Sequence, residues 1–292
     1  MSKQGQYPCD MQPDTSLLTA FQITQAQHLT DTPIASLWRV KRADGTTACL
    51  KCYTDDDLRD EAPGFDLLTA LDGQGAARVF ERTGAAVLME WLDGPSLGDM
   101  VRQGDDPRAT QILGDVAQQL HQSLIDPPHS LDPLPHRFEA LFAATFPPDC
   151  PSSVRATVQA ARQLAQPLLA NQTNIRPLHG DLHHDNVRGS DRGFLAFDAK
   201  GVLGEATYEL ANAFRNPLGS DALFSDPAVI LRRAAQWSAA LSVSQSHLLS
   251  WAAAYSALSL SWTHKGVFGP AVSKDMTLID TFLTLIAQDQ DS

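Results

Sequence analysis

The feature that most constrains this chain is residues 178–187, which read LHGDLHHDNV, together with residues 194–198, which read FLAFD. Two carboxylates and a carboxamide, those of Asp181, Asp198 and Asn186, lie there between apolar residues that would fix them in place. Asn186 follows Asp181 by five residues, and Asp198 follows it by seventeen. The pattern predicts a loop that carries Asp181 and Asn186, followed by a strand that ends at Asp198.

This spacing matches the kinase catalytic loop H-x-D-L-x-x-x-N and the metal-binding Asp that follows it. Phosphoryl transfer requires an oriented acceptor hydroxyl and Mg²⁺ held across the nucleotide phosphates. Mg²⁺ takes oxygen ligands, usually one or two carboxylates together with substrate phosphates. We therefore predict that Asn186 and Asp198 bind the metal and that Asp181 accepts the proton of the hydroxyl.

Two other interpretations of the stretch are open. It could be a plain polar turn in which His179 is a hydrogen-bonded core histidine. It could also be a zinc or iron site, since histidines and aspartates are frequent in residues 179–185. Against such a site, no H-E-x-x-H pattern places two histidines on one helical face. Successive side chains in the His-His-Asp run would also point in different directions.

The length and charge of the chain set broad limits. Its 292 residues suffice for two modest lobes, each with its own core. It has 34 acidic and 22 basic residues, which gives a formal net charge of −12. This balance argues against binding to nucleic acid and fits a cationic small-molecule substrate, although solubility alone would also account for it.

Neither a secretory signal nor a membrane span is predicted. Residues 1–15 are polar, and the apolar run 248–262 is short and broken by serines, which favours a buried helix. Cys49 and Cys52 lie three apart in an expected strand, so they would face opposite ways and could not share a metal or a disulfide. We expect a reduced, cytoplasmic monomer without membrane association.

Two β-hairpins are predicted in the N-terminal third. The first joins residues 37–42 and 47–53 through an Asp-Gly turn, and the second joins residues 78–82 and 85–91 around residues 83–84. Lys51 lies inside a strand, where a kinase places the lysine that contacts the α- and β-phosphates. A solvent-facing lysine is the simpler alternative.

A helix is predicted within residues 55–71, and its Glu61 is the natural partner of Lys51. Pro63 is tolerated only in the first turn of a helix, so Glu61 would lie at the helix start. Asp60 is therefore an alternative partner for Lys51.

The second hairpin runs into Gly94-Pro95, as expected of a hinge between two lobes. The backbone N–H and C=O groups of Glu90, Trp91 and Leu92 are predicted to pair with a purine edge there. Residues 94–98 (GPSLG) also match the G-x-S-x-G nucleophile elbow of serine hydrolases. However, antiparallel hairpins precede them instead of βαβ units, and Ser96 followed by Asp99 is a helix-capping pattern.

The remainder is predicted to be mainly helical. After Asp198 we expect a turn at residues 201–204 and the start of a helix at residues 208–214. Apolar periodicity predicts further helices at residues 109–123, 138–146, 154–170, 226–243, 246–263 and 274–288.

Taken together, these residues resemble the aminoglycoside phosphotransferase family of the protein-kinase-like fold. The form H-G-D-L-H-x-x-N at 179–186, Lys51, the hinge at 89–91 and Asp198 carry the resemblance, which covers about residues 30–265. The run 197–217 most resembles the streptomycin 6-phosphotransferase and hydroxyurea-resistance kinase subgroup. The resemblance implies that Glu209 supports the catalytic loop structurally. Residues 29–37 contain no glycine for a phosphate lid, and Lys200 has no assignable role.

The resemblance implies an α+β, bilobal protein-kinase-like fold, with a small antiparallel-sheet lobe at 1–93 and a helical lobe at 94–292. It implies an ATP-dependent (or GTP-dependent) enzyme that uses Mg²⁺ to phosphorylate a hydroxyl of an aminoglycoside such as streptomycin. Trp251, Trp262 and His264 are possible acceptor contacts. A kinase of an amino alcohol, homoserine-like molecule or sugar is the main alternative. A kinase-like binding protein without activity and a hydrolase built on Ser96 are the others.

Overall fold

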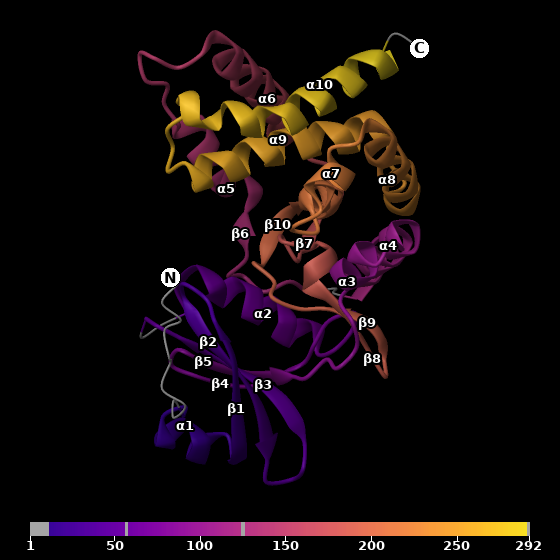
Figure 1. The fold of residues 1–292 in the computed structure, drawn as a ribbon. Helices are drawn as coiled ribbons and strands as arrows, with labels where there is room; N and C mark the ends of the chain where they lie inside the picture. Colours follow the sequence, from indigo (N-terminus) through magenta and orange to yellow (C-terminus); the bar gives the residue numbers. More distant parts are fainter. Residues whose placement is uncertain (1–11, 56–57, 124–125, 291–292) are drawn as a thin grey trace, which may run out of the picture. The chain divides into compact units, whose positions relative to one another are not determined.

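The computed structural model describes residues 12–55, 58–123 and 126–290, which pack into two compact units (Figure 1). One unit contains the chain up to Asp60 together with Ala77–Leu92, and the other contains Glu61–Ala76 and the chain from Asp93 onward. The predicted α+β class is confirmed, because the first unit is built on an antiparallel sheet and the second is mainly helical.

The first unit is a five-stranded antiparallel sheet in the order β1-β2-β3-β5-β4, preceded by a short helix. Alternating residues of the central strands, such as Ala48 and Leu50, turn into one core with Phe21 and Trp38. The predicted Asp-Gly turn is confirmed, with Gly45 at φ +87°. The elements are α1 (Thr15–Ala20), β1 (Ile23–Asp31), β2 (Ala35–Arg42), β3 (Thr47–Tyr53), β4 (Val79–Thr83) and β5 (Ala86–Glu90).

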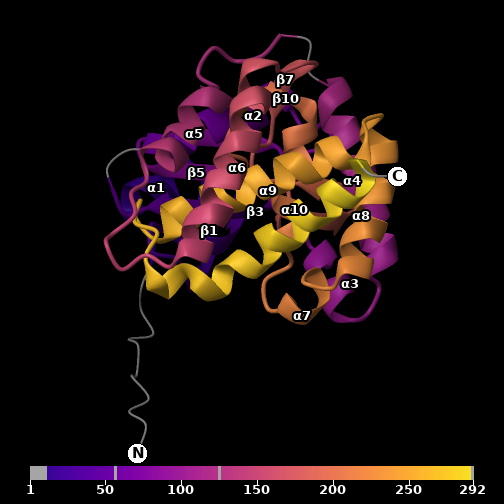
Figure 2. The ribbon, with the colours of Figure 1, turned by 90° about the horizontal axis from the view of Figure 1, so that it is seen from above.

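The second unit is a group of helices around a buried apolar helix, α9. This helix is buried on almost all sides, and it lies beside α6 and α10 (Figures 1 and 2). Its Trp251 and Leu258 lie in a hydrophobic core cluster of this unit. The helices are α2 (Ala62–Leu71), α3 (Leu97–Arg102), α4 (Asp106–Ser123), α5 (Leu134–Ala143), α6 (Ser152–Ala170), α7 (Asp221–Phe224), α8 (Pro227–Leu241), α9 (Gln245–Thr263) and α10 (Thr277–Gln290).

Short strands in the same unit support the predicted loop. A three-stranded sheet has the order β6-β10-β7, and β8 and β9 form a separate hairpin. These strands are β6 (Asp132–Pro133), β7 (Ile175–Leu178), β8 (Val187–Ser190), β9 (Gly193–Ala196) and β10 (Val202–Glu205). Turns of 3₁₀ helix lie at Arg59–Glu61, His184–Asn186, Ala206–Leu210, Asn212–Arg215 and Pro270–Met276.

Two local predictions are wrong. Residues 201–204 do not form a turn, because Val202 pairs with Leu178 in a sheet. Residues 208–214 do not start an α-helix but form two 3₁₀ turns. The carbonyl groups of Asn212 and Ala213 accept from the side chains of Asn216 and Arg233, so side chains take the place of continuing helical donors.

The predicted lobes, 1–93 and 94–292, differ from the observed units at residues 61–76, which pack with the helical unit. The Gly64 backbone lies so close to Ala199 that an added Cβ would come within 1.8 Å of the Ala199 carbonyl oxygen. The N–H of Ala196 donates to Gly75 O at 3.0 Å. No helix among the described residues combines the length and apolar character needed to cross a membrane.

Candidate active site

The loop that carries Asp181 is fixed at both ends by strands, β7 before it and β8 after it. Gly180 is in the left-handed region at φ +78°, and an added Cβ would lie 2.4 Å from Val202 Cγ2. The Lys200 N–H donates to His179 O at 2.7 Å, which ties the loop to the segment after Asp198. A glycine is therefore required at position 180 by both backbone conformation and space.

Glu209 supports the loop by accepting hydrogen bonds from its backbone, as the resemblance implies. Its two carboxylate oxygens accept the backbone N–H of His179 at 2.8 Å and of Gly180 at 3.0 Å. His121 Nε2 lies 3.5 Å from the same carboxylate. Burial alone would raise the pKa of Glu209, but His121 and the Gly180 N–H outweigh it, so the pKa is lowered. Glu209 therefore remains a buried anion that holds the loop backbone.

His179 is a hydrogen-bonded core histidine. Its Nδ1 accepts the Asp181 N–H at 3.3 Å, so its Nε2 is the atom that donates to Phe197 O at 2.8 Å. Burial lowers the pKa of His179, which favours this neutral form. The ring therefore connects the catalytic loop to the residue that precedes Asp198.

The Asp181 carboxylate is held by two amide side chains. Asn212 Nδ2 donates to Asp181 Oδ1 at 2.7 Å, and Asn186 Nδ2 donates to Oδ2 at 3.3 Å. A quarter of the Asp181 side chain is exposed. Burial raises the pKa of Asp181. Positive charge on the nearby side chains of His183 and Lys200 lowers it, but burial prevails. The arrangement leaves an oriented, accessible carboxylate that can accept a proton.

Asn186 and Asp198 meet at the open end of the β8–β9 hairpin. Val187 pairs with Ala196, and the Phe197 N–H donates to Asn186 O at 3.0 Å. Asp198 has a left-handed backbone at φ +62°, a conformation that aspartate tolerates better than most residues. The structure thus places the residue before Asp198 against the backbone of Asn186, whose side chain contacts Asp181, and metal binding by Asn186 and Asp198 stays a prediction.

The donor set fits Mg²⁺. Asn186 uses its Nδ2 toward Asp181, which leaves its Oδ1 as an oxygen that could bind Mg²⁺ together with the carboxylate of Asp198. Among the described residues, no three His, Cys, Asp or Glu side chains gather as a metal site. His184 is fully buried and lies against Trp237, and Asp185 forms an ion pair with Arg102. The zinc or iron interpretation therefore has no support here.

Lys200 forms an ion pair with Glu61, a contact that the sequence does not reveal. Glu61 lies at the N-cap of α2 and Pro63 in its first turn, as predicted. Lys51 is buried on β3, with its Nζ 5.1 Å from the Tyr53 ring centroid. The pairing of Lys51 with Glu61, and its phosphate contact, stay predictions.

The hinge residues lie at the end of β5. The Glu90 N–H donates to Arg78 O at 2.8 Å, so this group is already used within the sheet and is not offered to a purine. The Glu90 carboxylate accepts the Arg78 N–H at 3.0 Å. The Trp91 ring lies under the Arg39 guanidinium at 4.9 Å. Nucleotide pairing through the Glu90 C=O and through Trp91 and Leu92 remains a prediction.

Ser96 caps a helix. Its Oγ accepts the Asp99 N–H at 3.0 Å, while Asp99 Oδ2 accepts the Ser96 N–H at 3.0 Å. This capping box starts α3, and the side chain is buried. The hydroxyl is therefore structural, which removes the basis for the hydrolase.

The aromatic residues considered for acceptor binding divide into two kinds. Trp251 is fully buried and donates its indole N–H to Glu205 at 3.1 Å, so it belongs to the core. Trp262 is 40% exposed, with the Arg137 guanidinium 5.2 Å from its ring. His264 Nε2 lies 3.2 Å from Asp275. Trp262 and His264 thus remain available for an acceptor.

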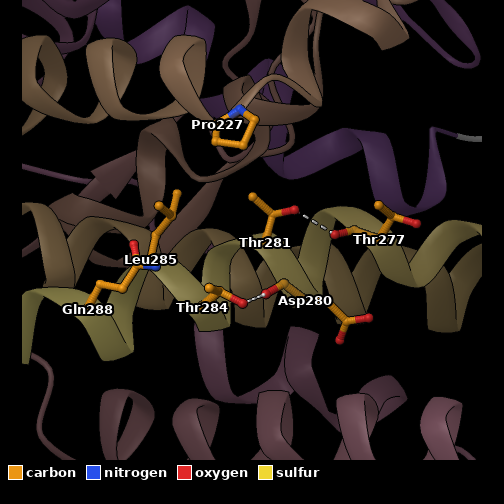
Figure 3. Close-up of a pocket in the computed structure, with 7 residues that line it drawn as sticks. All are labelled: Pro227, Thr277, Asp280, Thr281, Thr284, Leu285 and Gln288. Carbon is orange, nitrogen blue, oxygen red and sulfur yellow. Dashed lines mark hydrogen bonds between the residues drawn. The ribbon is translucent and has the colours of Figure 1, made fainter.

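A pocket of about 420 Å³ lies elsewhere, between α10 and the start of α8 (Figure 3). Its threonine hydroxyl groups are used by the neighbouring backbone, since Thr277 donates to Lys274 O, Thr281 to Thr277 O and Thr284 to Asp280 O. None of the predicted site residues lines it. It therefore does not serve the chemistry of the loop.

The fold and the loop define a phosphotransferase of the protein-kinase-like fold. The amicoumacin kinase hAmiN in complex with AMP-PNP, Ca²⁺ and Ami has this fold, with a TM-score of 0.60 and 14% identity over 94% of this chain and 92% of that one. A thermostable mutant of aminoglycoside phosphotransferase APH(4)-Ia has a TM-score of 0.59 and 12% identity, over 94% and 99% of the two chains. At these identities the likeness shows the fold alone.

Residues 21–266 match the model of the aminoglycoside/hydroxyurea antibiotic resistance kinase family, and the chain belongs to that family. It is 40% identical over 212 residues to streptomycin 3''-kinase of Klebsiella pneumoniae, a match that covers 70% of this chain and 76% of that protein. It is 28% identical over 185 residues to streptomycin 6-kinase of Streptomyces griseus, over 59% and 55% of the two chains. The prediction of an antibiotic-resistance kinase, a phosphotransferase with an alcohol group as acceptor, is confirmed.

Proposed function

We propose that this enzyme transfers the γ-phosphoryl group of ATP to a hydroxyl of streptomycin. The observation that carries the proposal is the Asp181 carboxylate, held by the amides of Asn212 and Asn186 on the loop that leads into the β8–β9 hairpin and Asp198. The 40% identity to a streptomycin 3''-kinase supports this substrate, and the net charge of −12 suits a cationic acceptor.

Each residue then has a distinct task. Asp181 accepts the proton of the acceptor hydroxyl while the oxygen forms its bond to the γ-phosphorus and the bond to the β-phosphate oxygen breaks. Asn186 and Asp198 would hold Mg²⁺, which when bound neutralises charge on the phosphates. Lys51 would bind the α- and β-phosphates, and Trp91 and Leu92 would bind the base. ADP and a phosphorylated antibiotic are the products.

We further propose the 3''-hydroxyl as the acceptor. The relative named streptomycin 3''-kinase is 40% identical to this chain in a match that covers 76% of that protein. The streptomycin 6-kinase is 28% identical in a match that covers 55% of that protein. This choice differs from the subgroup that the run 197–217 suggests. The hydroxyl position is the finest part of the proposal and the simplest to test.

The test is a transfer assay with purified protein, ATP and Mg²⁺ on streptomycin, with a metabolic panel of choline, ethanolamine, homoserine and sugars alongside. Among these acceptors, we expect only streptomycin to give ADP release. The NMR spectrum of its product should place the phosphate at the 3''-oxygen. Phosphate at the 6-oxygen would overturn the position but keep the substrate. Transfer to a metabolic acceptor in preference to streptomycin would overturn the substrate.

Ser96→Ala is a matched control for this assay. It removes the cap of α3 and should cost about 1 kcal/mol of stability, as loss of a serine N-cap usually does. Because the hydroxyl has no chemical task, kcat should stay within about two-fold of wild type. Loss of all activity in a folded Ser96→Ala protein would restore the hydrolase hypothesis.

A further inference from the structure

We infer that Asn212 is a positioning residue for the transfer, since its amide fixes the orientation of the Asp181 carboxylate. The inference rests on the proposed function, in which Asp181 accepts the hydroxyl proton. The Asn212 Nδ2 to Asp181 Oδ1 hydrogen bond is 2.7 Å long, the shorter of the two bonds that amide side chains donate to this carboxylate. No feature of the loop sequence marks Asn212, which lies 31 residues further along the chain.

The amides of Asn186 and Asn212, which both donate to the Asp181 carboxylate, come from different elements. Asn186 ends the 3₁₀ turn of the loop itself and also donates to Asp181 O at 3.0 Å. Asn212 comes from the second 3₁₀ turn after β10. Each amide donates to a different oxygen of Asp181, so rotation of the carboxylate about χ2 would break both bonds. Asparagine and aspartate χ2 angles are otherwise broad, so this restraint must come from partners.

The orientation of the Asn212 amide is itself fixed. Asn216 Nδ2 donates to Asn212 O at 3.0 Å and lies 3.3 Å from Asn212 Oδ1. Because Asn212 Oδ1 accepts from Asn216, its Nδ2 is the group that faces Asp181. Asn212 is 9% exposed and Asn216 is 5% exposed, so water competes little for these bonds.

A buried ion pair holds the turn that carries both asparagines. Arg233 on α8 is fully buried and donates to Asn216 O at 2.8 Å and to Ala213 O at 3.2 Å. The same guanidinium donates to Asp106 Oδ1 at 2.6 Å, at the start of α4. A buried arginine is tolerated only when it is paired and its donors are satisfied, and here both conditions are met. Two helices thus brace the turn behind Asn212.

This bracing matters for catalysis because a general base acts only within hydrogen-bond reach of the proton it removes. A displacement of about 1 Å can cost roughly 10²-fold in rate. Loss of the Asn212 bond leaves Asp181 with one amide and freedom to rotate. We therefore expect Asn212→Ala to lower kcat about 10- to 100-fold, with KM for ATP and streptomycin within about two-fold.

The variant Asn212→Asp tests the hydrogen-bond donor of Asn212 separately from the packing of its side chain. It keeps the shape of the side chain but replaces the donor by a second carboxylate, so kcat should be at least as low as in Asn212→Ala. Asn171→Ala is the control, because Asn171 donates only to Pro167 O at the exposed end of α6. That variant should retain wild-type kcat. Wild-type kcat in folded Asn212→Asp would overturn the inference.

A double-mutant cycle tests whether Asn212 acts through Asp181. In the Asp181→Ala background, Asn212→Ala should leave the residual rate unchanged, whereas independent effects would multiply. Multiplying effects would assign Asn212 a purely structural role. Thermal unfolding of each variant excludes loss of folded protein as the cause.

Crystal structures of the wild type and Asn212→Ala supply a readout that needs no acceptor. We expect the Asp181 carboxylate to be rotated or disordered in the variant and ordered in the wild type. An unchanged, ordered Asp181 would overturn the inference even if no substrate had been found. Conversely, inactivity of the wild type on streptomycin together with a rotated Asp181 in the variant would overturn only the proposed function.

Discussion

Asp181 lies on the catalytic loop and Glu209 binds the backbone of that loop. The surroundings of these two carboxylates shift their pKa values in opposite directions. Glu209 has a fully buried side chain, and its oxygens accept two backbone N–H groups. Asp181 is a quarter exposed, and it accepts from two amide side chains. The pKa of Glu209 is lowered and that of Asp181 is raised.

The difference shows that burial alone does not decide the charge of a carboxyl group. Burial raises the pKa of both residues, but only Glu209 has His121 and fixed backbone donors that more than compensate. Glu209 is thus suited to be a permanent structural anion. Asp181 keeps a surface open and a higher proton affinity, which a proton acceptor needs.

The largest expected effect is that of Asp181→Ala on turnover. General-base catalysis contributes about 10²- to 10⁴-fold, so we expect kcat to fall by that factor. Nucleotide binding should persist, since Asn186, Asp198 and Lys51 are intact. Steady-state kinetics and nucleotide titration by calorimetry measure the two quantities. Wild-type turnover in Asp181→Ala would remove Asp181 from the chemistry and end the contrast with Glu209.

Next in size is the effect of Glu209→Gln on stability. One amide oxygen cannot replace the two charged acceptors that serve His179 and Gly180, and a buried N–H would be left unpaired. We expect a loss of about 2–4 kcal/mol in the free energy of unfolding. Urea unfolding checks this value.

Glu205→Gln is the matched control, since Glu205 is another buried carboxylate of the same unit, paired with His247 and Trp251. It should also destabilise the protein, but kcat of the folded fraction should stay near wild type. In Glu209→Gln, kcat of the folded fraction should fall as the loop shifts. Equal kcat in both variants would mean that the support of the loop is not specific to Glu209.

Much of the site could be predicted because its parts are close in sequence. Asp181, Asn186 and Asp198 belong to one loop and one hairpin, so spacing alone brings them together. The hairpins of the first unit could be predicted equally well, because an Asp-Gly turn and strand alternation are local signals. Glu209 was found through the resemblance, and its hydrogen bonds to the loop bear out the implied support.

The remaining contacts join residues that are distant in sequence. Lys200 and Glu61 are 139 residues apart, and Arg233 and Asp106 are 127 apart. No periodicity encodes such pairs, so the partner of Lys200 and the role of Asn212 were not predicted. The same cause explains the wrong helix at residues 208–214, because Arg233 on a distant helix takes a carbonyl that a helix would use.

A smaller effect is expected on the pH dependence of stability. Glu209 has a folded-state pKa below its ordinary value of 4.5, so its stabilisation is present above pH 4.5 and is lost as pH falls through the lowered pKa. Asp181 has a folded-state pKa above its ordinary value of 3.8, so its burial costs stability as pH rises through that range.

Urea unfolding between pH 3 and 6 measures both contributions. Glu209→Gln should reduce the rise of stability with pH below pH 4.5, by at most about 1.4 kcal/mol per pH unit. Asp181→Asn should make stability rise more with pH above 3.8, by a similar limit. Slopes that change in the same direction in the two variants would contradict the assigned pKa directions.

The smallest expected effect is that of His121→Phe. The His121 ring is mostly buried, and its Nε2 lies 3.5 Å from Glu209 without meeting the geometry of a hydrogen bond. Phenylalanine retains most of the packing, so the free energy of unfolding at pH 7 should change by less than about 1 kcal/mol. Because His121 helps to lower the pKa of Glu209, its loss should move the acid-induced drop in stability to higher pH. A drop that stays at the wild-type pH would show that the two backbone donors are sufficient to keep Glu209 ionised, and the contrast with Asp181 would then rest on the loop backbone alone.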